Sequence, residues 1–106
     1  MHKKLKPLVH PGKILRETVF PQAGISISDA AQALGESDQT LHKILDEQMP
    51  LSAILCLKIA RLFNSSPEMW IRLQAGYDLR QAMLDENIAE SLSHIVPVVP
   101  HYRAST

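Results

Sequence analysis

The stretch from residue 27 to residue 44, ISDAAQALGESDQTLHKI, constrains the fold of this 106-residue chain most strongly. Ala31 is small where two helices would have to touch, and Gly35 follows where the chain would have to turn tightly. Three apolar residues recur at a spacing that would close the two helices against each other: Leu34, Leu41 and Ile44. This pattern predicts a helix-turn-helix, a motif that lays its second helix in the major groove of DNA.

The charge around this motif is unusual for a segment that binds DNA. Residues 26–48 hold one base, Lys43, and five acids, which gives them a net charge of −4. The five acids are Asp29, Glu36, Asp38, Asp46 and Glu47. Residues 1–16 hold five bases and no acid, and these bases are Lys3, Lys4, Lys6, Lys13 and Arg16. Because neutralised phosphates supply much of the affinity for DNA, we expect phosphate contacts to come mainly from the N-terminal bases.

Composition narrows the class of protein. A chain of this length with 45% hydrophobic residues is expected to form one domain. Its 11 basic and 11 acidic residues give no overall attraction to nucleic acid or to an anionic membrane. No apolar run approaches the roughly 18 residues that cross a bilayer, and no secretory signal is evident, so we expect a cytoplasmic protein. The single cysteine, Cys56, excludes an internal disulfide, and a core position is favoured over a catalytic thiol.

Apolar periodicity and capping residues predict an all-α, five-helix domain with a long C-terminal helix and a short extended tail. The first expected helix begins at Pro11 and is ended by Pro21 and Gly24, and the second runs from Ser26 or Ser28 to Leu34. The third covers residues 38–46 after an N-cap at Ser37. The fourth runs from Ser52 to Phe63, and the fifth runs from Ser66 to about residue 92. Residues 1–10 form a basic arm, either mobile or lightly docked. Residues 11–92 then form the helix-turn-helix domain, and residues 93–106 form the extended tail.

The helix over residues 52–63 has few polar positions and is expected to lie at the centre of the core. Its apolar residues are Ile54, Leu55, Leu57, Ile59, Leu62 and Phe63. The last helix carries an apolar stripe, formed by Trp70, Leu73, Tyr77, Leu84 and Ile88. Within that stripe Trp70 and Tyr77 lie seven residues apart, and a core position for both is favoured over a surface that binds a partner.

The first turns of the helix over residues 38–46 would meet base edges. Gln39 is suited to a bidentate contact with adenine, Thr40 to a thymine methyl group or a phosphate, and Lys43 to a guanine or a phosphate. His42 would add a polar contact. Asp38 has two alternatives, capping the helix or accepting a hydrogen bond from the amino group of cytosine, and capping is favoured.

Three sequence segments carry a resemblance to a known family over about residues 9–82. These are HPGKILRE, then DAAQALGESDQTLHKIL, and then LCLKIARLFNSSPEMWIRLQAGYDLRQA. Together they resemble the HigA-type antitoxins, also called the virulence-associated protein I family, within the Xre/Cro helix-turn-helix superfamily. The stretch SSPEMWIRLQAGYDL is the most specific, because helix-turn-helix spacing alone is common among repressors.

The resemblance implies a homodimeric antitoxin that binds a palindromic operator on double-stranded DNA, represses its own operon and neutralises a HigB/RelE-like toxin that cleaves messenger RNA. Carried over by position, the DNA-facing residues are Ser37, Gln39, Thr40, His42 and Lys43. This chain departs from the family at Asp38, where a basic residue is common, and at residues 46–49, where a basic loop with a glycine is common. Glu36 also stands at a turn position that is usually apolar.

The other polar features have simpler interpretations. Five histidines lack the spacing of a metal site, and surface or capping roles are favoured for His2, His10, His42, His94 and His101. The sequence therefore predicts no metal, no cofactor and no enzymatic activity. The acids Asp85, Glu86 and Glu90 either face a basic toxin or form a solvated helix surface. Residues 95–100, IVPVVP, are expected to be extended, either disordered or docked in a dimer or on a toxin, and docking in a dimer is slightly favoured.

Two further functions stay open. The chain is either mainly a toxin-binding neutraliser with weak affinity for DNA, or a stand-alone transcriptional regulator of Xre type. An open reading frame for a small basic protein beside this gene would argue against the stand-alone regulator.

Overall fold

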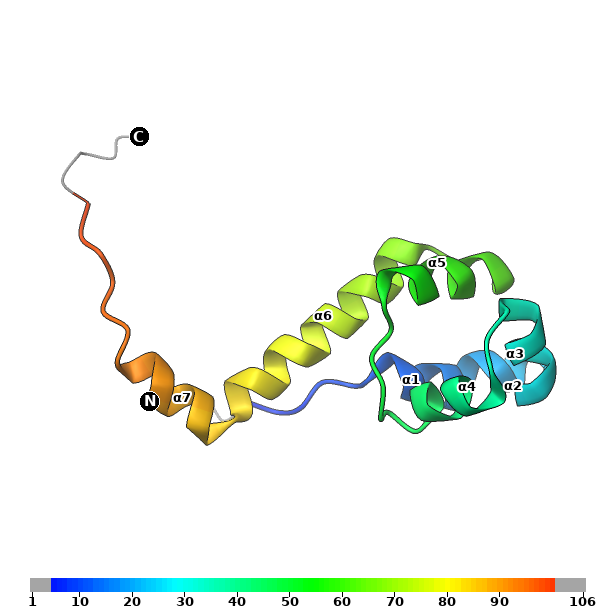
Figure 1. The fold of residues 1–106 in the computed structure, drawn as a ribbon, viewed down its shortest axis with the longest axis horizontal. Coiled ribbons are helices and arrows are strands. Elements are labelled where there is room, and N and C mark those ends of the chain that lie inside the picture. Colours follow the sequence, from blue (N-terminus) through cyan, green and yellow to red (C-terminus); the bar gives the residue numbers. More distant parts are fainter. Residues whose placement is uncertain (1–4, 101–106) are drawn as a thin grey trace.

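The computed structural model describes residues 5–100, and its regular elements in that range are all helical (Figure 1). A first helical stretch comprises α1 (Pro11–Ile14), a π-helical turn (Leu15–Val19) and α2 (Phe20–Ala23). The remaining helices are α3 (Ile27–Leu34), α4 (Asp38–Leu45), α5 (Ala53–Leu62), α6 (Pro67–Leu84) and α7 (Glu86–Ser93). The prediction of an all-α fold is confirmed, and α3 and α4 form the predicted helix-turn-helix.

The first helical stretch continues through Pro21, so the expectation that this proline helps to end the helix is wrong. A proline inside a regular α-helix clashes with the carbonyl group four residues earlier and lacks an N–H group. Here the preceding turn is widened, and the Phe20 N–H group donates to the Leu15 carbonyl oxygen five residues back. Gly24 ends the stretch in the left-handed conformation, with a φ of 65°.

Serine caps and a glycine define the helix-turn-helix. Ser26, rather than Ser28, caps α3, because its Oγ accepts a hydrogen bond from the Asp29 N–H group at 3.0 Å. Gly35 ends α3 with a φ of 70°, a conformation in which a residue with a side chain would be strained. The predicted cap of α4 is confirmed, since the Ser37 Oγ accepts from the Thr40 N–H group at 3.0 Å. These contacts fix the angle at which α4 leaves the turn.

The core lies between the first helical stretch, α3, α4, α5 and the start of α6. The three closing residues of the motif are buried as predicted: Leu34, Leu41 and Ile44. Trp70 is also in the core, where its indole Nε1 donates to the Ser65 Oγ at 2.9 Å. Cys56 is a buried core residue, and burial raises the pKa of its thiol.

Helix α5 buries only one side, which corrects the expectation that this largely apolar helix lies at the centre of the core. It contacts α3 and α6, and its buried residues are Leu55, Cys56, Ile59 and Ala60. On the opposite side of the helix, Ile54 and Leu57 are exposed.

The long last helix is broken, so the prediction of one continuous helix to about residue 92 is wrong. Helix α6 ends at Leu84, and Asp85 has an extended backbone with a ψ of 120°. The Asp85 Oδ1 accepts from the N–H groups of Asn87 and Ile88 at 2.8 and 3.3 Å, which starts α7 as a separate helix. Aspartate favours such N-cap positions over helix interiors because its carboxylate competes for backbone N–H groups.

Helix α6 carries α7 and the following residues away from the rest of the molecule (Figure 1). The radius of gyration is 18.5 Å, whereas a compact domain of this size has about 13 Å. None of the residues of α7 is buried, and residues 95–100 are extended, as predicted. Residues 5–10 are docked along α6, where the Arg80 Nη1 donates to the Lys6 carbonyl oxygen at 2.7 Å. Lys3 and Lys4 lie outside the described residues.

Candidate nucleic-acid interface

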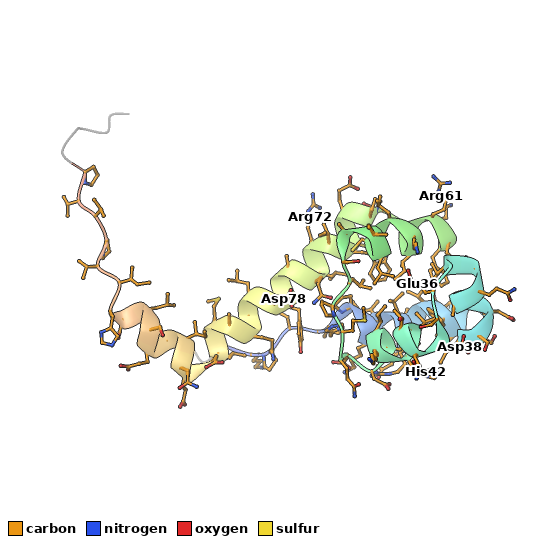
Figure 2. The ribbon with its side chains drawn as sticks, in the orientation of Figure 1. Glu36, Asp38, His42, Arg61, Arg72 and Asp78 are labelled. Carbon is orange, nitrogen blue, oxygen red and sulfur yellow. The ribbon has the colours of Figure 1, made fainter. Side chains whose placement is uncertain are left out.

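Helix α4 presents the predicted DNA-contacting residues on its outer side. Leu41, Ile44 and Leu45 are buried against the core, which leaves the other side of the helix open. Gln39, His42 and Lys43 are exposed on that side, and in Figure 2 His42 and Asp38 lie on the same outer side of α4. The geometry therefore matches a recognition helix, in which one face is held by the domain and the other is free to enter a groove.

The hydroxyl groups at the start of α4 are already engaged with each other. Besides accepting from the Thr40 N–H group, the Ser37 Oγ donates to the Thr40 Oγ1 at 3.0 Å. Thr40 is half-buried and Ser37 is exposed. These two predicted contact residues consequently have a structural role in capping α4. Thr40 keeps its own hydroxyl proton to donate to a phosphate, whereas the Ser37 hydroxyl proton is already donated to Thr40.

Asp38 links the two helices of the motif. Its Oδ2 accepts a hydrogen bond from the Ser28 Oγ at 2.7 Å, which joins the first turn of α4 to the first turn of α3. The expectation that Asp38 caps α4 is wrong, because Ser37 precedes it and takes the capping position. Asp38 is exposed, so its carboxylate remains accessible to a further hydrogen-bond donor.

Arg16 is held at the C-terminal end of α4. Its Nη1 donates to the Leu45 carbonyl oxygen, and its Nη2 lies 3.1 Å from the Glu17 Oε2 and 3.4 Å from the Glu47 Oε2. The hydrogen bond with Glu17 is the main reason that the pKa of Arg16 is above its ordinary value. A contact between Arg16 and a phosphate, as the sequence predicts, would require an exchange with one of these carboxylates.

Glu47 occupies an unusual backbone position directly after the recognition helix. Its φ is 64°, in the left-handed region that favours glycine. The Gln48 N–H group donates to the Lys43 carbonyl oxygen at 2.8 Å, and the Glu47 N–H group donates to the Ile44 carbonyl oxygen at 3.0 Å. This hydrogen-bond pattern closes the C-terminus of a helix in the way that a glycine normally does.

Glu36, in the turn of the motif, forms an ion pair that the sequence did not reveal. The Lys58 Nζ lies 2.7 Å from the Glu36 Oε2, and both side chains are partly buried. Because the two residues are 22 positions apart, no local spacing signalled the contact. The pair ties the turn to α5, and it neutralises one of the five acids that oppose DNA binding.

Two polar residues that sequence reasoning did not assign to the site support the loop after α4. The buried Gln74 accepts from the Leu51 N–H group at 2.8 Å and donates to the Asp78 Oδ1 at 2.9 Å. The buried His10 caps α1, with its Nδ1 accepting from the Gly12 N–H group at 2.8 Å. Its ring contacts Tyr77 edge-on at 4.8 Å between centroids. The capping role expected for a histidine is confirmed at His10.

Two of the predicted phosphate-binding residues near the N-terminus lie on the surface. Lys6 and Lys13 are exposed, and α1, which contains Lys13, packs directly on the recognition helix. Within residues 5–100 no group of three or more potential metal ligands is found. In the same part of the chain no helix has the length and apolar character that crossing a membrane requires.

Comparison with known proteins places this geometry in a family. Residues 13–70 match the family model described as helix-turn-helix. Virulence-associated protein I of Dichelobacter nodosus is 33% identical over 96 residues, which cover 91% of this chain and 86% of that protein. Antitoxin HigA-1 of Vibrio cholerae is 27% identical over 79 residues, 74% of each chain.

Solved structures extend this similarity to the fold. Pseudomonas aeruginosa antitoxin HigA, solved with the higBA promoter, has a TM-score of 0.79 and 33% identity, covering 89% of this chain and all of that one. Antitoxin GraA in complex with its operator has a TM-score of 0.82 and 32% identity, covering 94% and 99%. The family is one of helix-turn-helix DNA-binding antitoxins and regulators and is not a known enzyme family. The chain belongs to the helix-turn-helix family, in the group that includes virulence-associated protein I and the HigA and GraA antitoxins.

Proposed function

We propose that this protein is the antitoxin of a type II toxin–antitoxin module, which binds a palindromic operator as a homodimer, represses its own operon and neutralises a RelE-like toxin that cleaves messenger RNA. The observation that carries the proposal is the exposed outer side of α4 on a fold shared with HigA, which was solved with its promoter. A two-fold dimer would place two such helices about 34 Å apart on DNA.

The residues of α4 have distinct roles in this proposal. Gln39 forms a bidentate contact with adenine, and Lys43 reaches a guanine or a phosphate. His42 adds a polar contact, while Ser37 and Thr40 approach the phosphate backbone at the start of the helix. Lys6 and Lys13 supply phosphate contacts beside the recognition helix, together with Lys3, Lys4 and Arg16. No cofactor is needed.

The combined change Gln39→Ala and Lys43→Ala tests the recognition helix. We expect operator affinity to fall roughly 30-fold or more, because two side chains that bind base edges are removed, while binding to the toxin is unchanged. Gel shifts on the chain's own promoter measure the first effect and a pull-down with the toxin measures the second. Gln81→Ala, on the distant part of α6, removes the same amide and serves as the control. Operator binding that survives the double change would show that α4 is not the recognition helix.

A second function is favoured by the acids of the motif. Asp29 and Asp46 are exposed, and both lie on the segment that would face the phosphates. A protein with this surface would bind DNA weakly and act mainly by occupying its toxin. Gel shifts across a salt series, with and without the product of the neighbouring gene, separate the two functions, because a neutraliser gives no shift alone even at low salt. If no small basic protein is encoded beside this gene, the stand-alone regulator is the better description.

A further inference from the structure

Two exposed apolar surfaces occur on this chain at places that cannot meet within one molecule. The first is the outer side of α5 with the adjoining part of α6, where Ile54, Leu57 and Ile71 are 64%, 59% and 41% exposed. We call these three residues the α5/α6 face. The second is the C-terminal segment, α7 with residues 94–100, which lies beyond the opposite end of α6 (Figure 1).

The α5/α6 face is shaped to receive another element. A hollow of about 250 Å³ lies between the two helices and is lined in part by Leu57, Ile71 and Pro67. Arg61 and Arg72 flank this face and point outward, away from the side of the molecule that carries His42 (Figure 2). Neither arginine forms an ion pair within residues 5–100, whereas the adjacent Lys58 is already paired with Glu36. Glu68 also lines this hollow, and Arg72 helps, after the hydrogen bonds of the Glu68 carboxyl, to lower the pKa of that carboxyl. The net charge of Arg61, Arg72 and Glu68 together is therefore +1.

The C-terminal segment has the opposite charge and a matching apolar stripe. Ile88, Leu92 and Ile95 recur at spacings of four and three residues and are all exposed. Glu86 and Glu90 lie one turn apart on the same helix, and within residues 5–100 the Glu90 carboxylate pairs only with His94, at 3.1 Å, where both side chains are 73% exposed. An eight-residue helix with no buried residue gains almost nothing from packing in the monomer, because short helices are marginal without tertiary contacts.

We infer that α7 and residues 94–100 of one chain dock on the α5/α6 face of a second copy of this chain, and that the second copy returns the same contact. The inference rests on the homodimer of the proposed function and names its surface. Ile88, Leu92 and Ile95 cover Leu57, Ile54 and Ile71, while Glu86 and Glu90 approach Arg61 and Arg72. Such an exchange is isologous, as a two-fold dimer requires.

The position of the two surfaces fits simultaneous binding of DNA. The α5/α6 face lies on the other side of the molecule from Asp38 and His42 (Figure 2), so a docked C-terminal segment leaves α4 uncovered. The segment is also long enough to reach a neighbour, since α7 spans about 12 Å and residues 95–100 span about 20 Å when extended.

Charge reversal in the full-length chain tests the contact. One variant combines Arg61→Glu with Arg72→Glu, and a second combines Glu86→Arg with Glu90→Arg. Each is expected to raise the dissociation constant of the dimer at least about 10-fold, because attraction becomes repulsion at two symmetric sites. The variant that carries all four changes is expected to recover most of the dimer, since the charges are again complementary. Sedimentation velocity over a dilution series at low salt measures all three.

Matched controls make the outcome specific. Asp29→Arg with Asp46→Arg raises the net charge as much as Glu86→Arg with Glu90→Arg does, but on another surface, and is expected to leave the dissociation constant of the dimer unchanged. Circular dichroism and the urea midpoint check that each variant is folded, which is expected because every altered side chain is exposed. Apolar contact is tested separately by Leu57→Asp and by Ile88→Asp, each of which should also weaken the dimer.

Several results would overturn the inference. The first is a dimer whose dissociation constant neither charge reversal changes. The second is a variant with all four changes that stays dissociated. The third is a chain that is monomeric at every concentration and whose α5/α6 face becomes covered only when the neighbouring gene's product is added. None of these measurements involves DNA. A dimer that behaves as expected but binds no operator would refute the proposed function alone, and operator binding by a dimer that ignores the charge reversals would refute this inference alone.

Discussion

Glu47 is the residue at which fold and DNA binding conflict most directly. It takes a φ of 64° at the end of the recognition helix and places a carboxylate 3.4 Å from Arg16. The left-handed conformation costs a residue with a side chain about 1–2 kcal/mol relative to glycine, and the greater flexibility of an unfolded glycine offsets part of this.

We expect Glu47→Gly to raise the free energy of unfolding by about 0.5–1 kcal/mol, because it removes backbone strain and sacrifices only a weak, partly exposed ion pair. Urea unfolding measures this gain. The same change releases Arg16 from one of its two carboxylates, so the dependence of operator affinity on salt should steepen by about 0.9 in the log–log slope. Glu47→Gln separates the two effects, since it keeps the strain and removes the charge. Equal stability of the glycine and glutamine variants would contradict the backbone explanation.

His10 makes stability depend on pH. Burial lowers the pKa of His10 in the folded protein from the usual 6.5, and this effect outweighs the nearby carboxylates of Glu47 and Asp78, which raise it. A second proton would also occupy Nδ1, the atom that accepts the Gly12 N–H group. The unfolded chain therefore binds this proton more readily than the folded protein does.

The stability contributed by a neutral His10 is complete above pH 6.5 and is lost as the pH falls from there towards the lowered folded-state value. Urea midpoints measured from about pH 8 to about pH 5 should decline over this window. His10→Asn retains a capping side chain without a titrating ring, so its midpoints should decline less, although it loses the contact with Tyr77. An identical decline in both proteins would assign the pH dependence to other groups.

At the scale of elements, α1 and α4 approach each other closely at one glycine. A Cβ atom added at Gly12 would lie 1.9 Å from the Ile44 carbonyl oxygen, which is backbone and cannot move aside cheaply. The position of the recognition helix therefore depends on the absence of a side chain in the first turn of α1.

We expect Gly12→Ala to lower the free energy of unfolding by at least about 2–3 kcal/mol, because the two helices must separate. Gly76→Ala provides a matched comparison inside α6, where the added Cβ would meet its nearest neighbour, the Leu8 Cδ1, at an ordinary 3.7 Å. This second change should stabilise the protein by about 0.5–1 kcal/mol, since alanine is favoured over glycine in a helix. Urea unfolding compares the two, and a Gly12 variant as stable as the Gly76 variant would disprove the close contact.

Elements with local signals were predicted from the sequence. Ser37 and Gly35 act through hydrogen bonds and backbone angles within a few residues, so the turn of the motif could be placed correctly. The break at Asp85 was missed because the apolar spacing continues from α6 into α7. An aspartate in such a pattern fits either a helix interior or an N-cap, and only the backbone conformation at Asp85 distinguishes the two. Pro21 was assigned as a helix end because sequence alone does not show that a widened turn precedes it.

In the candidate site, too, features set by local spacing were predicted and features set by helix packing were not. The outward placement of Gln39 and Lys43 followed from helical periodicity, because Leu41 and Ile44 had to face the core. The partners of the charged residues did not follow from it. Arg16 meets Glu47 across 31 residues and Lys58 meets Glu36 across 22, and such contacts depend on how helices pack. The exposure of Leu57 could not be predicted either. An apolar residue in a sequence is expected to be buried, but the sequence does not show whether its own chain or a partner buries it.

For the molecule as a whole, the bases of residues 1–16 and the acids of residues 26–48 are separated along the sequence, and ion pairs in the folded structure neutralise only some of the acids. Two of the five acids of residues 26–48 are paired with Lys58 and Arg16. We therefore expect the proposed attraction to DNA to depend strongly on Lys3 and Lys4, which precede the docked residues 5–10 in the sequence.

Replacing Lys3 and Lys4 by alanine is expected to flatten the salt dependence of operator binding by about 0.9 in the log–log slope for each phosphate that is no longer neutralised, and so by up to about 1.8. Gel shifts over a range of salt concentrations give the slope. The arginine versions of both residues keep the charge and should keep the slope. A slope that alanine leaves unchanged would assign the phosphate contacts to other bases.

The separation of α4 from α7 along a molecule 57 Å long has an evolutionary consequence. If Gln39 and Lys43 read the operator and Glu86 and Ile88 hold the partner copy, as proposed above, selection can change the choice of operator without changing the choice of partner copy. After a gene duplication, two paralogues that diverge only in α4 would still assemble with each other. Mixed dimers of this kind would recognise operators with two unlike half-sites, and crosstalk between such modules would persist until the α5/α6 face also diverged.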